Sequence, residues 1–232
     1  MTEILLINPN ASAASTDMMV AIAQGAAPSG WRVTGATAAV GPGMIVNPVE
    51  LGAAAQELQR TWRRVSYGDG VGAGWDGVIV SAFGDPGMDT LRQNTALPVA
   101  GICEASLLEA AAGGRRFGIA TVTPDLAALI HQRVDELGLG ALYTGIRLTP
   151  GAPRELAADP ASLQRELALA VDDCIHLDGA KAVVIGGGPL AQAAGQLQAL
   201  YGVPIIEPIP AAMRQLAAKL ALRGRLAATG MA

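Results

Sequence analysis

The chain alternates short apolar runs with longer segments in which apolar residues recur every three or four positions. Continuous runs rich in Val and Ile are typical of strands covered on both faces, and the longer spacing is typical of helices. The alternation therefore predicts an α/β fold with parallel strands. The predicted strands are Ile4–Asn8, Arg32–Ala36, Gly77–Ser81, Val99–Cys103, Phe117–Thr121, Tyr143–Leu148, Ala182–Gly186 and Val203–Glu207.

Helices are predicted between these strands, because capping residues and helix-compatible Pro stand at their starts. Asn47, Thr123 and Asp159 each precede a Pro and are the predicted N-caps. The predicted helices are Ser15–Ala23, Pro48–Arg64, Pro124–Gly138 and Pro160–Gly179, with an amphipathic helix over Ala211–Gly230.

An internal pseudo-repeat is the strongest organisational feature. WDGVIVSAFGDPGMDTLRQNTALPVAGICEA and AKAVVIGGGPLAQAAGQLQALYGVPIIEPIPA both run from a strand through a small-residue loop and a helix to a second strand and a Glu. We therefore predict two pseudo-symmetric, open parallel-sheet (Rossmann-like) halves that share a cleft, with ligands at the carboxyl ends of the strands. The first half takes residues 1–97 plus 208–232, and the second takes 98–207.

Composition narrows the functional classes. Hydrophobic residues make up 51% of the 232 residues and charged residues 16%, so a compact globular protein is expected. The net charge of −4 and the lack of a basic stripe argue against nucleic acid as a partner. We expect no signal peptide, because the N-terminal residues lack a basic region followed by a long apolar stretch. We also expect no membrane span, because no apolar run reaches the ~18–20 residues required. Two cysteines and two isolated histidines indicate neither a disulfide framework nor a metal site, and the cytoplasm is the expected location.

The two small-residue loops suggest an anion-binding device. A loop of small residues that opens a helix exposes backbone N–H groups, which favour a carboxylate or another anionic oxygen. Gly84 in SAFGDPG, and Gly187 and Gly188 in GGGPL, would let a ligand approach the backbone closely. Ala82 and Phe83 of the first loop are further candidates for substrate binding. The alternative is that these glycines only turn the chain.

Three residues are candidates for acid–base chemistry: Cys103, Glu104 and Glu207, which stand at or just after strand ends. A carboxylate can act as a base when burial raises its pKa, and a thiol can react when its pKa is lowered. The alternatives are a buried structural cysteine and carboxylates that cap helices or form salt bridges.

Three polar residues at the ends of other predicted strands are candidates for substrate binding. Asn8, Ser81 and Thr121 follow or end strands at the expected cleft. The alternative for Asn8 is a helix cap, and Ser81 could point into the sheet. We favour Thr121 over Thr123 as a ligand donor, because Thr123 is the better helix cap.

The motifs INPNAS, SAFGDPG, GICEA, GRRFGIATVTP and GVPIIEP together resemble the hydantoin racemase branch of the aspartate/glutamate racemase superfamily, over essentially the whole chain. The resemblance implies two α/β halves with the active site between them, no cofactor, and a homo-oligomer. It also implies two cysteines, one in each half, that remove and return a proton on opposite faces of a carbon acid. Here these two positions hold Ala82 and Gly187, neither of which can carry a proton.

Three functional hypotheses follow. The first is a racemase or isomerase for a small carboxylate or cyclic amide, with another base in place of the thiols. The second is a cofactor-independent lyase, decarboxylase or hydrolase on the same scaffold that uses a Glu or a water. The third is a binder of small molecules without catalytic activity.

Overall fold

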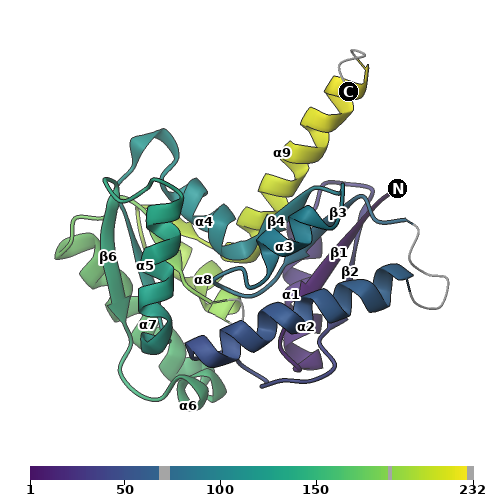
Figure 1. Ribbon diagram of the computed structural model, residues 1–232. Helices are drawn as coiled ribbons and strands as arrows, with labels where there is room; N and C mark the ends of the chain where they lie inside the picture. The colour runs from purple at the N-terminus through teal and green to yellow at the C-terminus, as the bar shows by residue number, and fades with distance from the viewer. Residues whose placement is uncertain (68–73, 188–189, 229–232) are drawn as a thin grey trace.

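The computed structural model describes residues 1–67, 74–187 and 190–228, which form two four-stranded parallel sheets (Figure 1). The first sheet has the order β2-β1-β3-β4 and the second the order β6-β5-β7-β8, so both halves arrange their strands in the same way. The α/β fold with two pseudo-symmetric sheets is confirmed. The strands are β1 (Thr2–Asn8), β2 (Trp31–Thr37), β3 (Gly77–Val80), β4 (Val99–Gly101), β5 (Phe117–Thr121), β6 (Tyr143–Leu148), β7 (Val183–Ile185) and β8 (Ile205–Ile206).

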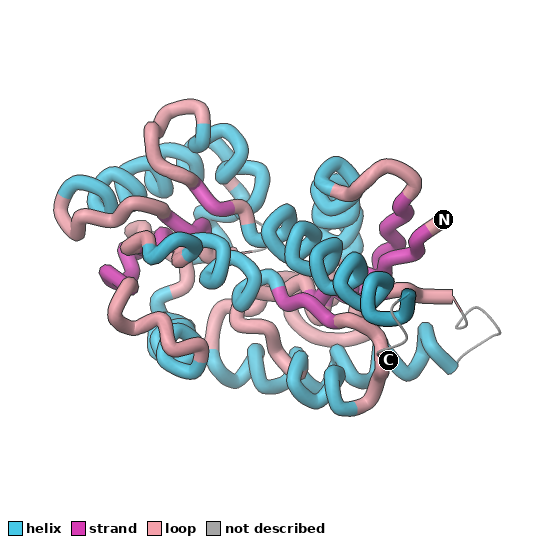
Figure 2. The backbone as a smooth tube through the Cα atoms, turned by 90° about the horizontal axis from the view of Figure 1, so that it is seen from above, coloured by secondary structure: helices cyan, strands magenta, loops and turns pink. Residues whose placement is uncertain are grey.

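Helices connect the strands and surround both sheets (Figure 2). Asn47 and Asp159 cap helices as predicted, because their side-chain oxygens accept from the N–H groups of Glu50 at 2.9 Å and Ser162 at 3.2 Å. The helices are α1 (Ala13–Ala26), α2 (Pro48–Tyr67), α3 (Met88–Gln93), α4 (Ile102–Ala110), η1 (Ala112–Gly114), η2 (Pro124–Leu126), α5 (Ala127–Glu136), α6 (Pro153–Ala158), α7 (Pro160–His176), α8 (Ala191–Gln198) and α9 (Pro208–Ala228).

Alternate strand residues pack against opposite helical layers. In β1, Ile4 and Leu6 face the core beneath α1, α4 and α9, whereas Leu5 and Ile7 face the core beneath α2 and α3. The first of these cores continues into the second half, where it includes Phe117 of β5. The other face of the second sheet packs on α7 and α8. One shared core therefore joins the two halves.

The predicted division of the chain after residue 97 needs correction. The strand at Val99–Gly101 pairs with β3 in the first sheet, so that sheet extends beyond the predicted boundary. Helix α9 returns to the first half and packs on α1, α4, β3 and β4. We therefore propose that the first half consists of residues 1–101 and α9.

Four predicted strands are too long, those that correspond to β3, β4, β7 and β8, and the error at β4 changes the candidate site. The predicted strand Val99–Cys103 ends at Gly101, and α4 begins at Ile102. Cys103 and Glu104 consequently lie in the first turn of a helix instead of at a strand tip.

In the described parts of the chain, no helix is long and apolar enough to cross a membrane.

Candidate active-site cavity

A small cavity of about 40 Å³ lies where the carboxyl ends of strands from the two sheets meet. This volume has room for a few water molecules. Both halves contribute residues to its walls, as the pseudo-repeat predicts. Met44 and Ile45, in the segment between β2 and α2, also line the cavity. The described lining residues are Asn10, Met44, Ile45, Ser81, Ala82, Phe83, Val122, Thr123, Leu126, Gly186, Gly187 and Leu190.

The first polar group of the lining is Asn10, whereas the expected ligand Asn8 is fully buried and absent from the described lining. The Asn8 amide Nδ2 donates to Asn10 Oδ1 at 2.8 Å and to Thr16 Oγ1 at 2.9 Å, so it fixes the turn between β1 and α1. Asn10 Oδ1 also accepts from Ser12 N–H at 3.0 Å. Among the described residues, the Asn10 Nδ2 donor has no acceptor, which leaves it available to a ligand.

The loop after β3 brings Ser81, Ala82 and Phe83 to the cavity. Ser81 Oγ donates to Met19 Sδ at 3.0 Å, so its hydroxyl is partly engaged. The backbone N–H groups of Ala82 and Phe83 have no acceptor within the described chain and are available for hydrogen bonding. Gly84 stands outside the described lining and has a φ of +102°, which the turn requires.

The loop after β7 differs from its counterpart in the first half. Gly186 N–H donates to Ala120 O at 2.8 Å and Gly187 N–H donates to Ile185 O at 3.0 Å. These two donors are therefore satisfied internally, unlike those of Ala82 and Phe83. A Cβ atom on Gly187 would lie 2.9 Å from Leu190 Cδ1, so the glycine makes room for this lining side chain. The candidate residue Gly188 lies outside the described residues.

The two threonines after β5 do not take the predicted roles. Thr121 Oγ1 donates to Gly186 O at 2.6 Å in the buried interior, and Thr121 is absent from the described lining. Thr123 lines the cavity and its side chain makes no capping hydrogen bond to the following helix. Because the Thr121 proton goes to Gly186 O, Thr123 Oγ1 donates to Thr121 Oγ1 at 3.2 Å. Thr123 can therefore meet a ligand as a hydrogen-bond acceptor.

Asp85, which follows the Ala82–Gly84 loop, caps helix α4. Its Oδ1 accepts from Cys103 N–H at 2.8 Å and its Oδ2 accepts from Glu104 N–H at 2.7 Å. Among the described non-glycine residues only Asp85 has a positive φ, of 49°. Burial raises the pKa of the Asp85 carboxyl to about 7, although the two N–H bonds oppose the shift. Asp85 thus ties the first-half loop to the start of α4.

Neither Cys103 nor Glu104 belongs to the described lining of the cavity. Cys103 is fully buried, and burial raises the pKa of its thiol well above the usual value, so it stays protonated. Partial burial raises the pKa of Glu104, but the hydrogen bonds and charge of Arg92, with further cations, hold it below its ordinary value. Glu104 is consequently a weak base.

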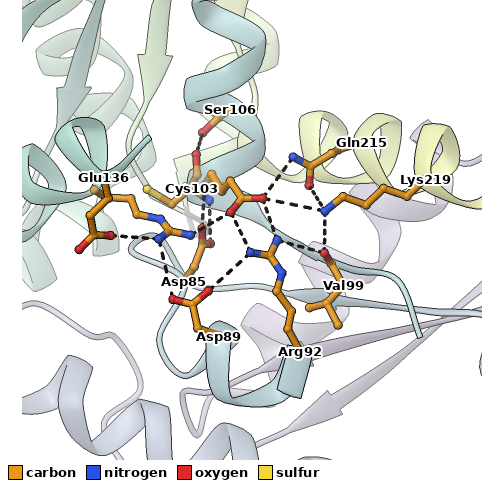
Figure 3. Close-up of polar contacts among 11 residues, drawn as sticks. Asp85, Asp89, Arg92, Val99, Cys103, Ser106, Glu136, Gln215 and Lys219 are labelled. Carbon is orange, nitrogen blue, oxygen red and sulfur yellow. Dashed lines mark hydrogen bonds and ion pairs between the residues drawn. The ribbon is translucent and has the colours of Figure 1, made fainter. Parts of the chain in front are cut away.

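Glu104 is the centre of a cluster of cations that joins the two halves. Figure 3 shows Arg92 of α3 and Lys219 of α9, which belong to this cluster. Its carboxylate accepts from Arg92 at 2.7 and 2.9 Å and from Arg133 of α5 at 2.9 Å. Lys219 Nζ of α9 lies 3.9 Å away from Glu104 Oε1. Because Arg92 precedes β4 and Arg133 belongs to the second half, these bonds give Glu104 a structural role.

Glu207 precedes α9 and is also absent from the described lining. Its carboxylate lies beside α8, where a Cβ on Gly195 would be 3.6 Å from Glu207 Oε2. Burial raises the pKa of Glu207, and the charge of Arg214 opposes this shift. The three acid–base candidates therefore lie in three different environments, and the structure does not bring them together at the cavity.

The cavity's chemistry is that of uncharged hydrogen bonding. Its described lining contains three polar side chains and the unpaired backbone N–H groups of Ala82 and Phe83. The other described lining residues are apolar or glycine, and none of the described lining residues is charged. No group of three or more His, Cys, Asp or Glu side chains that could hold a metal occurs in the described ranges. Such a cavity suits a small, neutral, polar ligand with an apolar substituent.

Comparison with known proteins gives a consistent result. Residues 4–216 match the profile described as Asp/Glu/Hydantoin racemase. A hydantoin racemase of Paenarthrobacter aurescens is 27% identical over 223 residues, which cover 94% of this chain and 91% of the relative. The structure is similar to allantoin racemases from Klebsiella pneumoniae (TM-score 0.88, 27% identity, 96% of this chain and 89% of the other) and from Pseudomonas fluorescens (TM-score 0.87, 25% identity, 95% and 92%).

Proposed function

Because the chain belongs to the Asp/Glu/hydantoin racemase family, we propose that it is a racemase-type isomerase that binds a small, uncharged cyclic amide in the cavity. We infer this substrate class from the absence of charged side chains among the described lining residues. A zwitterionic amino acid would bring its ammonium group into this cavity without a carboxylate partner. An unpaired buried charge costs several kcal/mol, whereas a neutral ring with C=O and N–H groups does not incur this cost.

The polar groups suit a hydantoin-like ring. A hydantoin has a carbon acid beside a carbonyl, and loss of its proton moves negative charge onto the carbonyl oxygen. The Asn10 amide and the N–H groups of Ala82 and Phe83 are donors that would stabilise this charge. The relatives named hydantoin racemase and allantoin racemase support this substrate class.

The proton would pass to water and not to a side chain. In the resembling family, thiols occupy the positions of Ala82 and Gly187, which line the cavity from opposite halves. We propose that water takes the proton from one face, the electron pair of the C–H bond enters the enolate, and another water returns a proton to the other face. No cofactor takes part. Because a positioned acid or base contributes ~10²–10⁴-fold, turnover should be slow.

A second candidate function is binding without turnover. It is favoured by the same observation that makes catalysis slow: the described lining holds no side chain that exchanges a proton near neutral pH.

The experiment that separates these functions follows an enantiopure 5-substituted hydantoin in D₂O. Calorimetry measures binding, NMR measures deuterium incorporation at C5, and circular dichroism measures loss of optical activity, each against a protein-free control. An isomerase increases the rates of both deuterium uptake and racemisation, and a binder gives heat without either increase. Asn10→Ala should weaken binding about tenfold, whereas Asn94→Ala, at the end of α3, should not. If neither binding nor exchange is detected, both proposed functions are wrong.

We also propose a cytoplasmic location and a homo-oligomeric assembly. Both cysteines are unpaired and buried, which suits a reducing compartment. The assembly rests on the family resemblance, and light scattering after size-exclusion chromatography tests it.

A further inference from the structure

One wall of the cavity is a segment of the first half that is fastened to the second. We call residues 38–47, between β2 and α2, the strap. Met44 and Ile45 of the strap line the cavity, and Met44 also packs on the apolar core beneath α7 and α8. Near the other wall, Pro42 O of the strap accepts from Ala11 N–H at 3.0 Å. The strap therefore spans the cavity between the two halves.

The fastening depends on one guanidinium group. Arg154 Nη2, at the start of α6, donates to Met44 O at 3.2 Å and to Glu50 Oε1 at 2.6 Å. Glu50 Oε2 in turn accepts from Val46 N–H at 2.9 Å. Arg154 thus holds the strap directly through Met44 and indirectly through Glu50. Figure 1 shows the start of α2 beside α6, which brings these residues together.

These bonds are suited to opening and closing. The Arg154 side chain is 54% exposed and that of Glu50 is 22% exposed, so the pair contributes little to global stability. It acts instead on a local equilibrium, because loops with few buried contacts open independently of the core. Gly41, with a φ of +125°, gives the strap a backbone position suited to a hinge.

The strap limits the space and the access of the cavity. Met44 and Ile45 of the strap form one wall of a cavity of about 40 Å³, which has room for a few waters. A change in the position of the strap therefore changes how a ligand enters, and the strap is a wall held by exposed hydrogen bonds.

We propose that Arg154 is a positioning residue, whose bonds to Met44 and Glu50 latch the strap over the cavity. The latch sets how often the cavity opens and so limits entry and exit of the ligand. Its effect on a cyclic amide rests on the proposed function, but the latch itself does not.

Reactivity of a cavity thiol tests the latch without any ligand. Ala82→Cys places a thiol in the lining of the cavity. The rate at which this thiol reacts with methyl methanethiosulfonate reports how often the strap opens. The parent protein, which lacks this thiol, gives the background reaction of the two buried native cysteines. Adding Arg154→Ala should raise the labelling rate about fivefold to tenfold, because an ion pair and a hydrogen bond are lost. The free energy of unfolding should fall by no more than the same fold-change, which is about 1–1.4 kcal/mol, so the protein stays folded during labelling.

Three matched variants make the result specific. Arg165→Ala removes a comparably exposed arginine, bonded to Glu166 at 3.1 Å in α7, and should leave the labelling rate unchanged. Glu50→Gln should raise the rate, and adding it to Arg154→Ala should give less than the product of the two effects. Arg154→Lys keeps the charge and should largely restore the parent rate. A labelling rate within twofold of the parent in Arg154→Ala, or an equal rise in Arg165→Ala, overturns the proposal.

Hydrogen exchange and ligand kinetics provide two further readouts. In the otherwise unmodified protein, Arg154→Ala should speed exchange of the Val46 amide about fivefold to tenfold, and no change there overturns the latch. With a 5-substituted hydantoin, association and dissociation rates should rise together while Kd changes less than either rate. If no hydantoin binds, the proposed function fails, whereas the labelling and exchange results still decide the latch.

Discussion

Replacing Glu104 by Gln should destabilise the protein through the cations that surround this side chain. The side chain of Glu104 is 10% exposed, and those of Arg133 and Arg92 are 15% and 31% exposed. Removing one partner of a buried ion pair costs ~3–5 kcal/mol, because the remaining charge is left unpaired. Arg92 is partly solvated and Gln keeps one acceptor oxygen, so we expect a loss of about 2–3 kcal/mol.

The assay is equilibrium urea unfolding at pH 7, followed by circular dichroism. Glu109→Gln is the matched control, since Glu109 is in the same helix and pairs with Arg214 at 2.7 Å, but their side chains are 30% and 53% exposed. This control should cost at most about 1 kcal/mol. The reasoning is refuted if Glu104→Gln costs no more than Glu109→Gln. If Glu104→Gln instead abolishes deuterium exchange at full stability, Glu104 is a catalytic base.

Four further variants test residues in and near the cavity. Because the pKa of Asp85 is raised from 3.8 to about 7, the folded state binds this proton more tightly than the unfolded state, and Asp85 lowers stability as pH rises from about 4 to 7. Asp85→Asn should remove this pH dependence in urea titrations, and an unchanged slope would contradict the assignment. Thr121→Val should cost ~1–3 kcal/mol in urea unfolding, because Gly186 O loses its buried donor. Thr123→Val should chiefly weaken hydantoin binding in calorimetry, and the reverse pattern would restore Thr121 as the ligand donor. Cys103→Ala should leave the rate of deuterium exchange unchanged, and loss of exchange at full stability would make this thiol catalytic.

The sheets could be predicted from the sequence because buried parallel strands have a local signature. Phe117–Thr121 and Tyr143–Leu148 coincide with β5 and β6 to the residue. The first is a buried, mostly apolar run, whereas the second is a half-buried edge strand that mixes apolar residues with Thr144 and Arg147. The pseudo-repeat predicted two similar halves that share a cleft, and the matching strand orders of the two sheets confirm their similarity.

The details of the site depended on contacts that have no local signature. Nothing near Ile102 indicates that a helix begins there, because its N-cap Gly101 has no side chain. The first-turn N–H groups are instead bonded by the carboxylate of Asp85, which lies 18 residues before Cys103. The strap depends on Arg154, which is 104 residues from Glu50. The sequence also could not distinguish the roles of Thr121 and Thr123, because these roles depend on which hydroxyl contacts Gly186 O, 65 residues from Thr121.

The central claim is that this is a racemase-type cavity from which the proton-carrying side chains are missing. Its most direct test is the rate of deuterium uptake at C5 of a bound hydantoin in the double variant Ala82→Cys/Gly187→Cys, compared with the parent. The Cβ on residue 187 requires only that the flexible Leu190 side chain shifts. The account predicts an increase of about 10²–10⁴-fold, the contribution of positioned acid–base groups. A double variant that folds and binds the hydantoin but exchanges at the parent rate would contradict it.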